Sequence, residues 1–281
     1  MARLKDLFMM VFAFLIFYGV AFGDTTLEYR SFPKGKVSLY LTTKYVRMDA
    51  EEYGIFPVTL IYDKNLRKIS ILNHEEKSYV EVDERLLKDL RRMREEMEAQ
   101  LSDLPPFMRE MAKQMMIMPG CREIEEIPDE VCGNSKIIGT EKFKDLTAKV
   151  VDGCKIFDVE KNSFVICRYW FVDGEKLNLD LEDFKTLTSF LEFEWEFVKA
   201  MGSFCGTEAI SIFLARPEKT LRLGYDLPIP VKALSVSDGK EKTKMILDKI
   251  STNKLTEDLF RLPQNYRKME IKVPKFRGGG Y

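Results

Sequence analysis

The sequence is poor in histidine and lacks the glycine-rich motifs that bind phosphate groups. Its one histidine, His74, lies in the charged segment NHEEKS, which is typical of an exposed turn. A multi-histidine metal site is therefore excluded, and Ser-His-Asp or Cys-His catalysis would depend on this turn residue alone. Neither GxxxxGKS/T nor GxGxxG occurs, so we expect no nucleotide, and no other cofactor is indicated.

A net charge is lacking as well. The 44 Lys and Arg residues nearly balance the 45 Asp and Glu residues, so no overall field would attract nucleic acid. Acidic residues are plentiful, but no spacing marks two of them as a catalytic pair. Hydrolysis by two carboxylates is therefore the least favoured function, and we expect neither a nucleic-acid partner nor enzyme activity.

Beyond its start, the chain has no apolar run long enough to cross a membrane. At the start, Arg3 and Lys5 precede LFMMVFAFLIFYGV, and a small-residue site ends at Gly23. This is the pattern of a cleaved secretory signal over residues 1–23. The alternative, an uncleaved anchor, would need about 20 apolar residues. We therefore expect a periplasmic or secreted protein.

No low-complexity or Pro/Ser-rich linker divides the rest of the chain. Residues 24–274 are predicted to form a single β-rich domain with helical insertions. The final residues 275–281, KFRGGGY, are predicted to be a disordered tail.

The five cysteines include no CxxC pair, which argues against a thioredoxin-type redox centre and against a zinc ribbon. In an exported chain they favour disulfides instead. Cys121 and Cys132 flank a charged loop and form one predicted pair. Cys205 is left over, either as a buried free thiol or as the site of an intermolecular bridge.

A second disulfide is predicted within the hairpin GCKIFDVEKNSFVICRYW. A four-residue loop at 159–162 would set Phe157 opposite Phe164 and Cys154 opposite Cys167. Opposed cysteines on neighbouring antiparallel strands lie close enough to bond. Such a bridge would contribute about 3 kcal/mol to stability in the loop-entropy description.

The segment VTLIYDKNLRKISILNHEEKSYVEV, residues 58–82, predicts three antiparallel strands. Four-residue turns at 64–67 and 74–77 would set Tyr62 opposite Ile69. Alternation along the strands gathers apolar side chains on one face, which must be covered. These apolar residues are Val58, Leu60, Tyr62, Ile69, Ile71, Val80 and Val82. The apolar exceptions on the opposite face are Ile61, Leu72 and Tyr79.

The next segment predicts an amphipathic helix that is broken at Pro105-Pro106. Its apolar stripe, at spacings of three and four, consists of Leu86, Leu90, Met93, Met97, Leu101 and Leu104. A short second helix, rich in methionine, is predicted to follow. We expect the two helices to fold back and lay their methionine-rich stripe on the sheet.

The segment 181–204 contains FLEFEWEF, which alternates as a strand would, but the longer window carries a narrow polar stripe at helical spacing. We therefore predict a helix with Asp180 as its N-cap. Glu194 lies among the apolar residues opposite that stripe. It is predicted either to pair with an arginine such as Arg168, to lie at a helix end near solvent, or to be a polar anchor at a cavity mouth.

The order of these elements, ending with a second helix and the closing LFRLPQNYRKM, resembles an uncharacterised family of exported bacterial proteins. That family is similar to the superfamily of periplasmic lipoprotein carriers and outer-membrane lipoprotein receptors. The resemblance implies an incomplete, strongly curved antiparallel β-barrel whose concave side is partly covered by helices and holds lipid chains. It supplies no functional residue. The expected fold class is α+β, with a curved antiparallel sheet wrapped over amphipathic helices.

The predicted function is non-enzymatic binding or carriage of a lipid or another hydrophobic molecule. The ligand would lie in an apolar cavity between the sheet and the methionine-rich helices, since methionine adapts to chains of variable shape. The predicted ligand-binding residues are Leu60, Tyr62, Ile71, Val80, Met93, Met97, Met108, Met111, Met115 and Glu194. The alternative is a structural or interaction protein of the cell envelope, whose methionines fill a packed core and whose helices dock partner proteins.

Overall fold

The structure is a computed structural model that describes residues 23–31, 35–53, 56–109, 111, 122–123, 136–158, 163–201, 203–204, 223, 225, 227–237 and 240–271. The first strands are β1 (Thr25–Ser31), β2 (Lys36–Leu41), β3 (Tyr45–Tyr53), β4 (Phe56–Asp63), β5 (Lys68–Asn73) and β6 (Ser78–Val82). The later strands are β7 (Arg122–Glu123), β8 (Lys136–Phe143), β9 (Leu146–Asp158), β10 (Ser163–Asp173), β11 (Ser203–Phe204), β12 (Pro228–Ser237), β13 (Lys240–Thr252) and β14 (Arg267–Met269). The helical elements are α2 (Glu84–Ser102), η2 (Gly174–Leu177), α4 (Leu181–Met201) and η3 (Glu257–Phe260).

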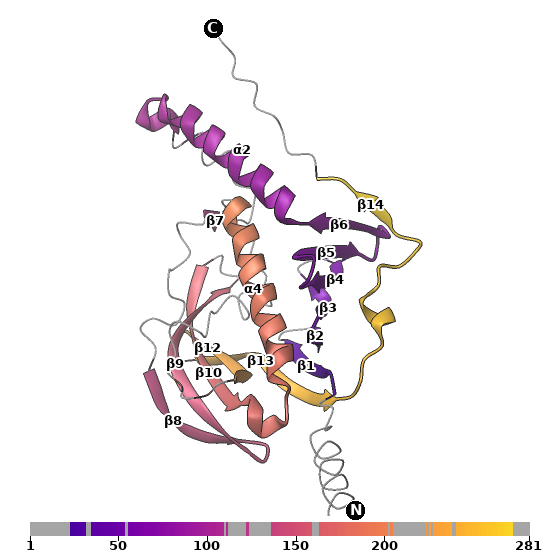
Figure 1. Ribbon diagram of the computed structural model, residues 1–281. Coiled ribbons are helices and arrows are strands. Elements are labelled where there is room, and N and C mark those ends of the chain that lie inside the picture. The colour runs from indigo at the N-terminus through magenta and orange to yellow at the C-terminus, as the bar shows by residue number, and fades with distance from the viewer. Residues whose placement is uncertain are drawn as a thin grey trace, which may run out of the picture.

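Twelve strands form one open sheet in the order β14-β6-β5-β4-β3-β2-β1-β13-β12-β10-β9-β8. All neighbours in it are antiparallel except β14 and β6, which are parallel. Figure 1 shows that the sheet curves around α4, which stands between strands β1–β6 and strands β8–β10. The predicted fold class, α+β with a curved, mostly antiparallel sheet, is confirmed.

The predicted register of the meander β4-β5-β6 is confirmed. Tyr62 pairs with Ile69, and the turns fall at 64–67 and 74–77. Each turn is built by the residue that ends the preceding strand. The carboxyl of Asp63 accepts hydrogen bonds from the next backbone N–H groups, and the amide oxygen of Asn73 does the same. These side chains fix the turns locally, which is why the register could be predicted.

The inner, concave face of strands β1–β6 is apolar along three rows of paired residues. The rows are Thr25-Leu41-Val46-Tyr62-Ile69-Val82, Leu27-Leu39-Met48-Leu60-Ile71-Val80 and Tyr29-Val37-Ala50-Val58-Asn73. Most of these side chains belong to the main hydrophobic core, together with residues of α4 and of β10. The first row lies deepest, and exposure increases along the other two rows toward β5 and β6.

The outer face of the same strands is covered by the C-terminal strap, residues 253–271. The predicted apolar exceptions Ile61, Leu72 and Tyr79 form a second, smaller hydrophobic cluster with the strap, in which Phe260 is buried. The ring of Phe260 stacks on Tyr45 at a centroid distance of 5.2 Å. The strap then pairs β14 with β6, so the outward apolar residues mark the surface on which the chain end lies.

The helix predicted over 181–204 is confirmed as α4, although it ends at Met201 and residues 203–204 form β11. Asp180 caps it, because its carboxyl accepts the N–H of Glu182 at 2.8 Å. Phe190 and Phe193 point to the inner face of the sheet, where both rings contact Tyr62.

The predicted register of the cysteine hairpin is also confirmed. In β9 and β10, Phe157 pairs with Phe164 and Cys154 pairs with Cys167. Cys167 is buried, but the side chain of Cys154 lies outside the described side chains. The disulfide between them therefore stays a prediction. Other predictions fall wholly outside the described residues, namely those on Cys121, Cys132, Cys205, Met115, residues 1–22 and residues 275–281.

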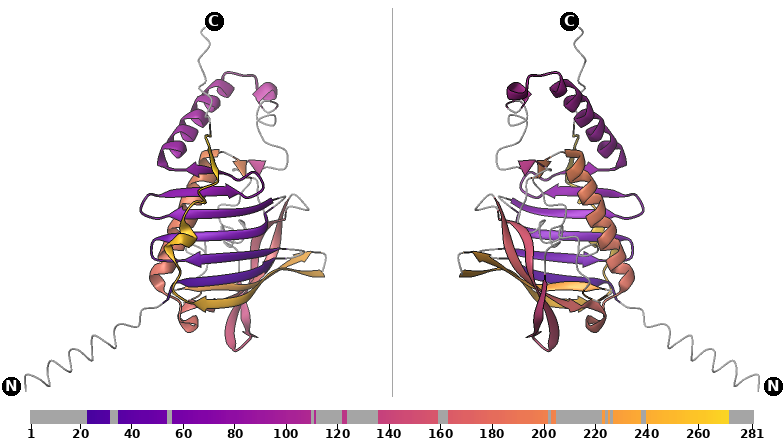
Figure 2. Two further views of the ribbon diagram at one scale, coloured as in Figure 1. Left: turned by 90° about the vertical axis from the view of Figure 1, so that its right-hand side faces the viewer. Right: turned by 90° about the vertical axis from the view of Figure 1, so that its left-hand side faces the viewer.

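The predicted first helix is confirmed as α2, which Asp83 caps through the N–H of Leu86 at 2.9 Å. The prediction that the methionine-rich stripe lies on the sheet is wrong for Met108 and Met111, which are exposed, although Met93 on α2 packs against the main core. Figure 2 shows that α2 projects beyond the last strands of the sheet. Phe107, Met108 and Met111, which follow the far end of α2 in the chain, are 75%, 52% and 48% exposed. We call these three residues the apolar tip. A helical stripe shows that one face is apolar but not what covers it.

Candidate functional site

The centre of the inner face is packed between Tyr62 and α4. The Tyr62 hydroxyl shares a hydrogen bond of 2.8 Å with the hydroxyl of Ser189. Its ring lies 5.7 Å from that of Phe190 and 5.9 Å from that of Phe193. Burial of the hydroxyl raises the pKa of Tyr62. Because Leu60 beside it is also buried, this part of the predicted site is occupied by the protein's own side chains.

The inner face is less completely covered toward β6 and the start of α2. Val58 on β4, Ile71 on β5 and Met93 on α2 are only partly buried, and all three pack against the main core. Phe197, near the end of α4, has the same position at the edge of the core, and Val80 on β6 is half-buried too. We call these five residues the apolar margin. The apolar margin lies between the buried core and solvent, and its residues come from three strands and two helices.

Glu194 is a buried carboxyl within α4. It is 7% exposed. Loss of hydration raises the pKa of this carboxyl to about 8, so it is mostly protonated at neutral pH. No residue that the structure describes forms a hydrogen bond or an ion pair with it. The predicted pairing with Arg168 is wrong, because that guanidinium pairs with Asp152 and Glu241 on neighbouring strands.

The structure brings together part of the predicted ligand-binding set and separates the rest. Leu60, Tyr62, Ile71 and Met93 belong to one apolar core. Val80, which shares their inner face, and Met97, further along α2, are half-buried. Met108 and Met111 belong to the apolar tip, so they do not line a common site with Leu60 and Tyr62. Met115 lies outside the described residues.

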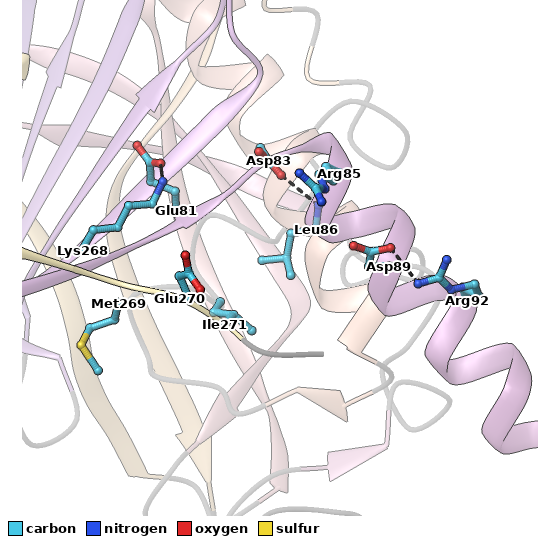
Figure 3. A pocket seen from close by; sticks show the side chains of 10 residues that line it. All are labelled: Glu81, Asp83, Arg85, Leu86, Asp89, Arg92, Lys268, Met269, Glu270 and Ile271. Atoms are coloured by element: carbon cyan, nitrogen blue, oxygen red, sulfur yellow. Dashed lines mark hydrogen bonds and ion pairs between the residues drawn. The ribbon is translucent and has the colours of Figure 1, made fainter. Parts of the chain in front are cut away.

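A groove that sequence reasoning missed lies between the first turns of α2 and the strap. Figure 3 shows its walls, and its volume is about 360 Å³. The lining residues are Glu81, Asp83, Arg85, Leu86, Asp89, Arg92, Lys268, Met269, Glu270 and Ile271.

Most charges in this groove already have partners. Glu81 pairs with Lys68 and Lys268, Asp89 pairs with Arg92, and Asp83 caps α2. The lining includes both acidic and basic side chains, so the groove has no strong net charge that would attract ions of one sign. Its two walls come together only through the pairing of β6 with β14, a contact between distant parts of the chain that no local pattern indicates.

His74 is not the exposed turn residue that the sequence predicts. Its Nε2 lies 2.8 Å from the Thr59 hydroxyl and its Nδ1 lies 2.6 Å from the Tyr266 hydroxyl. The Thr59 hydroxyl in turn donates to Asp49 at 2.5 Å, and Asp49 pairs with Arg47. Since Thr59 is buried, it is not open to a substrate. These residues tie the C-terminal strap to the outer face of the sheet.

Two general features bear on function. Across the described residues, no group of three or more His, Cys, Asp or Glu side chains is arranged to hold a metal ion. None of the helices in the described part of the chain is both long and apolar enough to cross a membrane.

Comparison with known proteins gives a weak structural likeness. No family model matches the chain, and no curated protein does. A crystal structure of an uncharacterised conserved protein from Thermus thermophilus is similar, with 6% sequence identity and a TM-score of 0.39. The match covers 89% of this chain and 91% of that one. At this TM-score the likeness supports no statement about function.

Proposed function

We propose that the chain is an exported, non-enzymatic protein that binds or carries a lipid or another hydrophobic molecule on the inner face of its curved sheet. The apolar margin is the observation that carries this proposal. Its five side chains, from β4, β5, β6, α2 and α4, stay partly exposed. Four of them pack against the buried core, and the fifth, Val80, pairs with Ile71 on the neighbouring strand. An acyl chain laid along them would gain about 0.8 kcal/mol for each methylene that it buries.

The arrangement of α4 and α2 also suggests how room for a ligand would be made. Of the two, α4 is held firmly by the rings that contact Tyr62. By contrast, α2 begins at the edge of the sheet directly after β6, contacts α4, and then runs away from the sheet. Movement of α2 away from the strands β4–β6 would widen the inner face without breaking the sheet, and the flexible side chain of Met93, on α2, would adapt to an acyl chain of variable shape.

Glu194 would contribute a polar contact to such a ligand. A protonated carboxyl donates a hydrogen bond, so it would suit the carbonyl of an ester or of a fatty acid rather than a cationic head group. Replacement of Glu194 by Leu separates this role from a structural one. If Glu194 serves binding, the variant is more stable than the parent and binds its ligand more weakly; a loss of stability with unchanged binding would assign it to the fold.

Native mass spectrometry of the exported protein, purified without detergent, tests the proposal directly. We expect adducts of lipid mass, whose identity follows from solvent extraction of the bound molecules. The variant Met93→Asp should lose the adducts, because it places a charge within the apolar margin. The matched control is Met108→Asp, which changes the same residue type at the apolar tip and should retain them. Equal occupancy in both variants would place any ligand elsewhere, and failure to bind added lipids would contradict the proposal.

A second candidate function is supported by the apolar tip. Exposed large apolar side chains at the end of a projecting helix are typical of a contact with another protein. Under this alternative the chain is a structural or interaction protein of the envelope, and the inner face is only a core.

A photo-crosslinking amino acid at position 107 in cells would then give one discrete adduct. The same group at Leu66, which is similarly exposed on a turn at 62%, should give none. Equal labelling at both positions would show random collision rather than a docking surface.

A further inference from the structure

The start of β1 is fixed against the first turn of α4. The backbone N–H of Thr25 donates to the carboxyl of Asp183 at 3.0 Å. Both residues are buried, with exposures of 0% and 2%. On the other side, the carboxyl of Asp24 accepts the N–H of Leu255 at 2.7 Å. These two hydrogen bonds hold Asp24 in place, one through its own side chain and one through the next residue.

The backbone nitrogen of Asp24 must lie close to Asp183. One residue of chain spans at most about 3.6 Å, and Thr25, the next residue, is bonded directly to that carboxyl. The nitrogen of Asp24 is thus within about 7 Å of the Asp183 carboxyl by this reach. A rotation about the bonds of a terminal residue would be enough to bring the two groups into contact.

Asp183 has no cation to balance it among the residues that the structure describes. Burial, together with the nearby carboxyls of Asp180 and Asp24, raises its pKa to about 7, although hydrogen bonds from Thr25 act in the opposite direction. Two lysines at the first turn of α4 have other partners: Lys185 pairs with Glu182, and Lys64 donates to the hydroxyl of Thr186. The Thr25 hydroxyl lies against the same carboxyl but is buried without a hydrogen bond of normal geometry. This corner of the molecule therefore needs both a positive charge and a hydrogen-bond donor.

Gly23, the residue before Asp24, fits the same corner tightly. A Cβ atom at this position would lie 2.2 Å from the carbonyl oxygen of Thr252. Glycine is therefore required here for as long as the preceding segment is attached, and a small residue is also what a signal peptidase requires before its cleavage point. Packing against Thr252 and recognition by a signal peptidase thus both require a small residue at position 23.

We propose that cleavage between Gly23 and Asp24 creates an internal ion pair, in which the new α-ammonium of Asp24 binds the carboxyl of Asp183 and locks β1 against α4. This inference rests on the predicted secretory signal. A peptidase hydrolyses the Gly23–Asp24 peptide bond: water supplies the hydroxyl of the new Gly23 carboxyl group and a proton to the new amine. The amine takes a second proton from solvent and becomes an ammonium, which can donate to both Asp183 and the Thr25 hydroxyl. Cleavage would then release the mature chain from its signal and also raise the stability of the fold.

The test compares two chains that differ only at the start. One begins at Asp24 after release from a fusion, and the other keeps Phe22 and Gly23 in front of it, so that its first ammonium lies two residues away. The chain that begins at Asp24 should have a Tm higher by about 3 to 6 °C, the shift expected for a paired and partly buried charge in a domain of this size. With Asp183→Asn in both chains this difference should vanish, whereas the exposed control Glu182→Gln should preserve it.

The pH dependence of the Tm difference between the two chains provides an independent test. The α-ammonium has an ordinary pKa of about 8, and the ion pair raises it in the folded chain. The ion pair also lowers the pKa of Asp183 from the value of about 7 that it has without the ammonium. The extra stability should therefore be present at about pH 7 to 8, should disappear as the pH rises through the raised pKa of the ammonium, and should also decline as the pH falls through the lowered pKa of Asp183. Equal Tm values for the two chains at pH 7, or a difference that survives Asp183→Asn, would overturn the proposal.

A labelling experiment covers the case in which Asp183→Asn fails to fold. The chain that begins at Asp24 is treated briefly with acetic anhydride at pH 7, and labelling of its α-amine is followed by peptide mass spectrometry. We expect labelling at least tenfold slower in the folded chain than in urea. Equal rates would show that the amine is free and would also overturn the proposal. Neither result depends on lipid binding, so the proposed function stands or falls separately.

Discussion

The two faces of strands β1–β6 are covered in different ways. On the inner face, α4 covers the sheet with aromatic side chains, and Tyr62 shares only one hydrogen bond with it. On the outer face, the C-terminal strap combines a small apolar cluster around Phe260 with a chain of hydrogen bonds through Thr59, His74 and Tyr266. At its centre, the inner cover thus depends mainly on buried area, which adapts to other apolar molecules, and its other polar contacts, such as that of Thr186 with Thr43, lie at the edge of the sheet. The outer cover depends more on directed polar contacts, which do not adapt in this way. This difference favours the inner face as the place for a hydrophobic ligand.

The largest expected effect comes from truncation of the inner cover. Phe193 is fully buried against Tyr62, so Phe193→Ala should lower the free energy of unfolding by about 3 to 5 kcal/mol. Urea unfolding followed by circular dichroism measures this loss. The exposed control Phe107→Ala should change stability by less than about 0.5 kcal/mol. A small loss at Phe193 would show that α4 is not held mainly by packing.

Truncation of the outer cover should cost less, because the strap can detach while the sheet stays folded. We expect Phe260→Ala to lower the free energy of unfolding by about 2 to 3 kcal/mol. Limited proteolysis should then cut within residues 253–266 before it cuts β4, β5 or β6. Simultaneous cleavage of strap and sheet would instead make the two covers one cooperative unit.

The contribution of α4, the cover of the inner face, to stability should depend on pH through Glu194. Burial raises the pKa of Glu194 from an ordinary value of 4.5 to about 8, so the unfolded chain loses this proton first as the pH rises. Stability from this group is therefore complete below about pH 4.5, declines between pH 4.5 and 8, and is level above.

The variant Glu194→Gln isolates this contribution, because Asp183 titrates alike in both proteins. We expect the stability of the variant relative to the parent to rise by about 3 to 4 kcal/mol between pH 5 and pH 8. Urea midpoints at the two pH values give the comparison. A constant difference across this range would show that Glu194 is hydrated or paired.

The smallest expected effect lies in the polar chain of the outer face. Tyr266→Phe removes the hydroxyl that contacts His74 at 2.6 Å and keeps the ring contact. We expect a loss of about 1 kcal/mol, the usual net value of one hydrogen bond. Hydrogen exchange should localise the change to the strap, and faster exchange throughout α4 would contradict the separation of the two faces.

Local patterns predicted much of this fold. The turns after Asp63 and Asn73 are set by side chains two or three residues away, so the register of β4-β5-β6 follows from the sequence itself. Likewise α4 is recognisable from its polar stripe, since helical periodicity is a property of one continuous segment.

Features that depend on distant contacts were not predictable in the same way. Ile61, Leu72 and Tyr79 showed that the outer face carries apolar residues, but not that the C-terminal strap covers them. The apolar stripe of α2 was recognised from the sequence. Which residues cover each part of the stripe was not, because periodicity does not say how far a helix extends beyond the sheet. For the same reason the neighbours of His74 and the partners of Arg168 could not be read from nearby residues.

The most direct test of the account is to locate a bound acyl chain. The exported protein is incubated with a fatty acid that carries a photoreactive diazirine, irradiated, and mapped by peptide mass spectrometry. We predict adducts on the apolar margin, at Ile71, Val80 and Met93. Adducts confined to the apolar tip, at Phe107 and Met108, would contradict the central claim that the inner face receives the hydrophobic ligand.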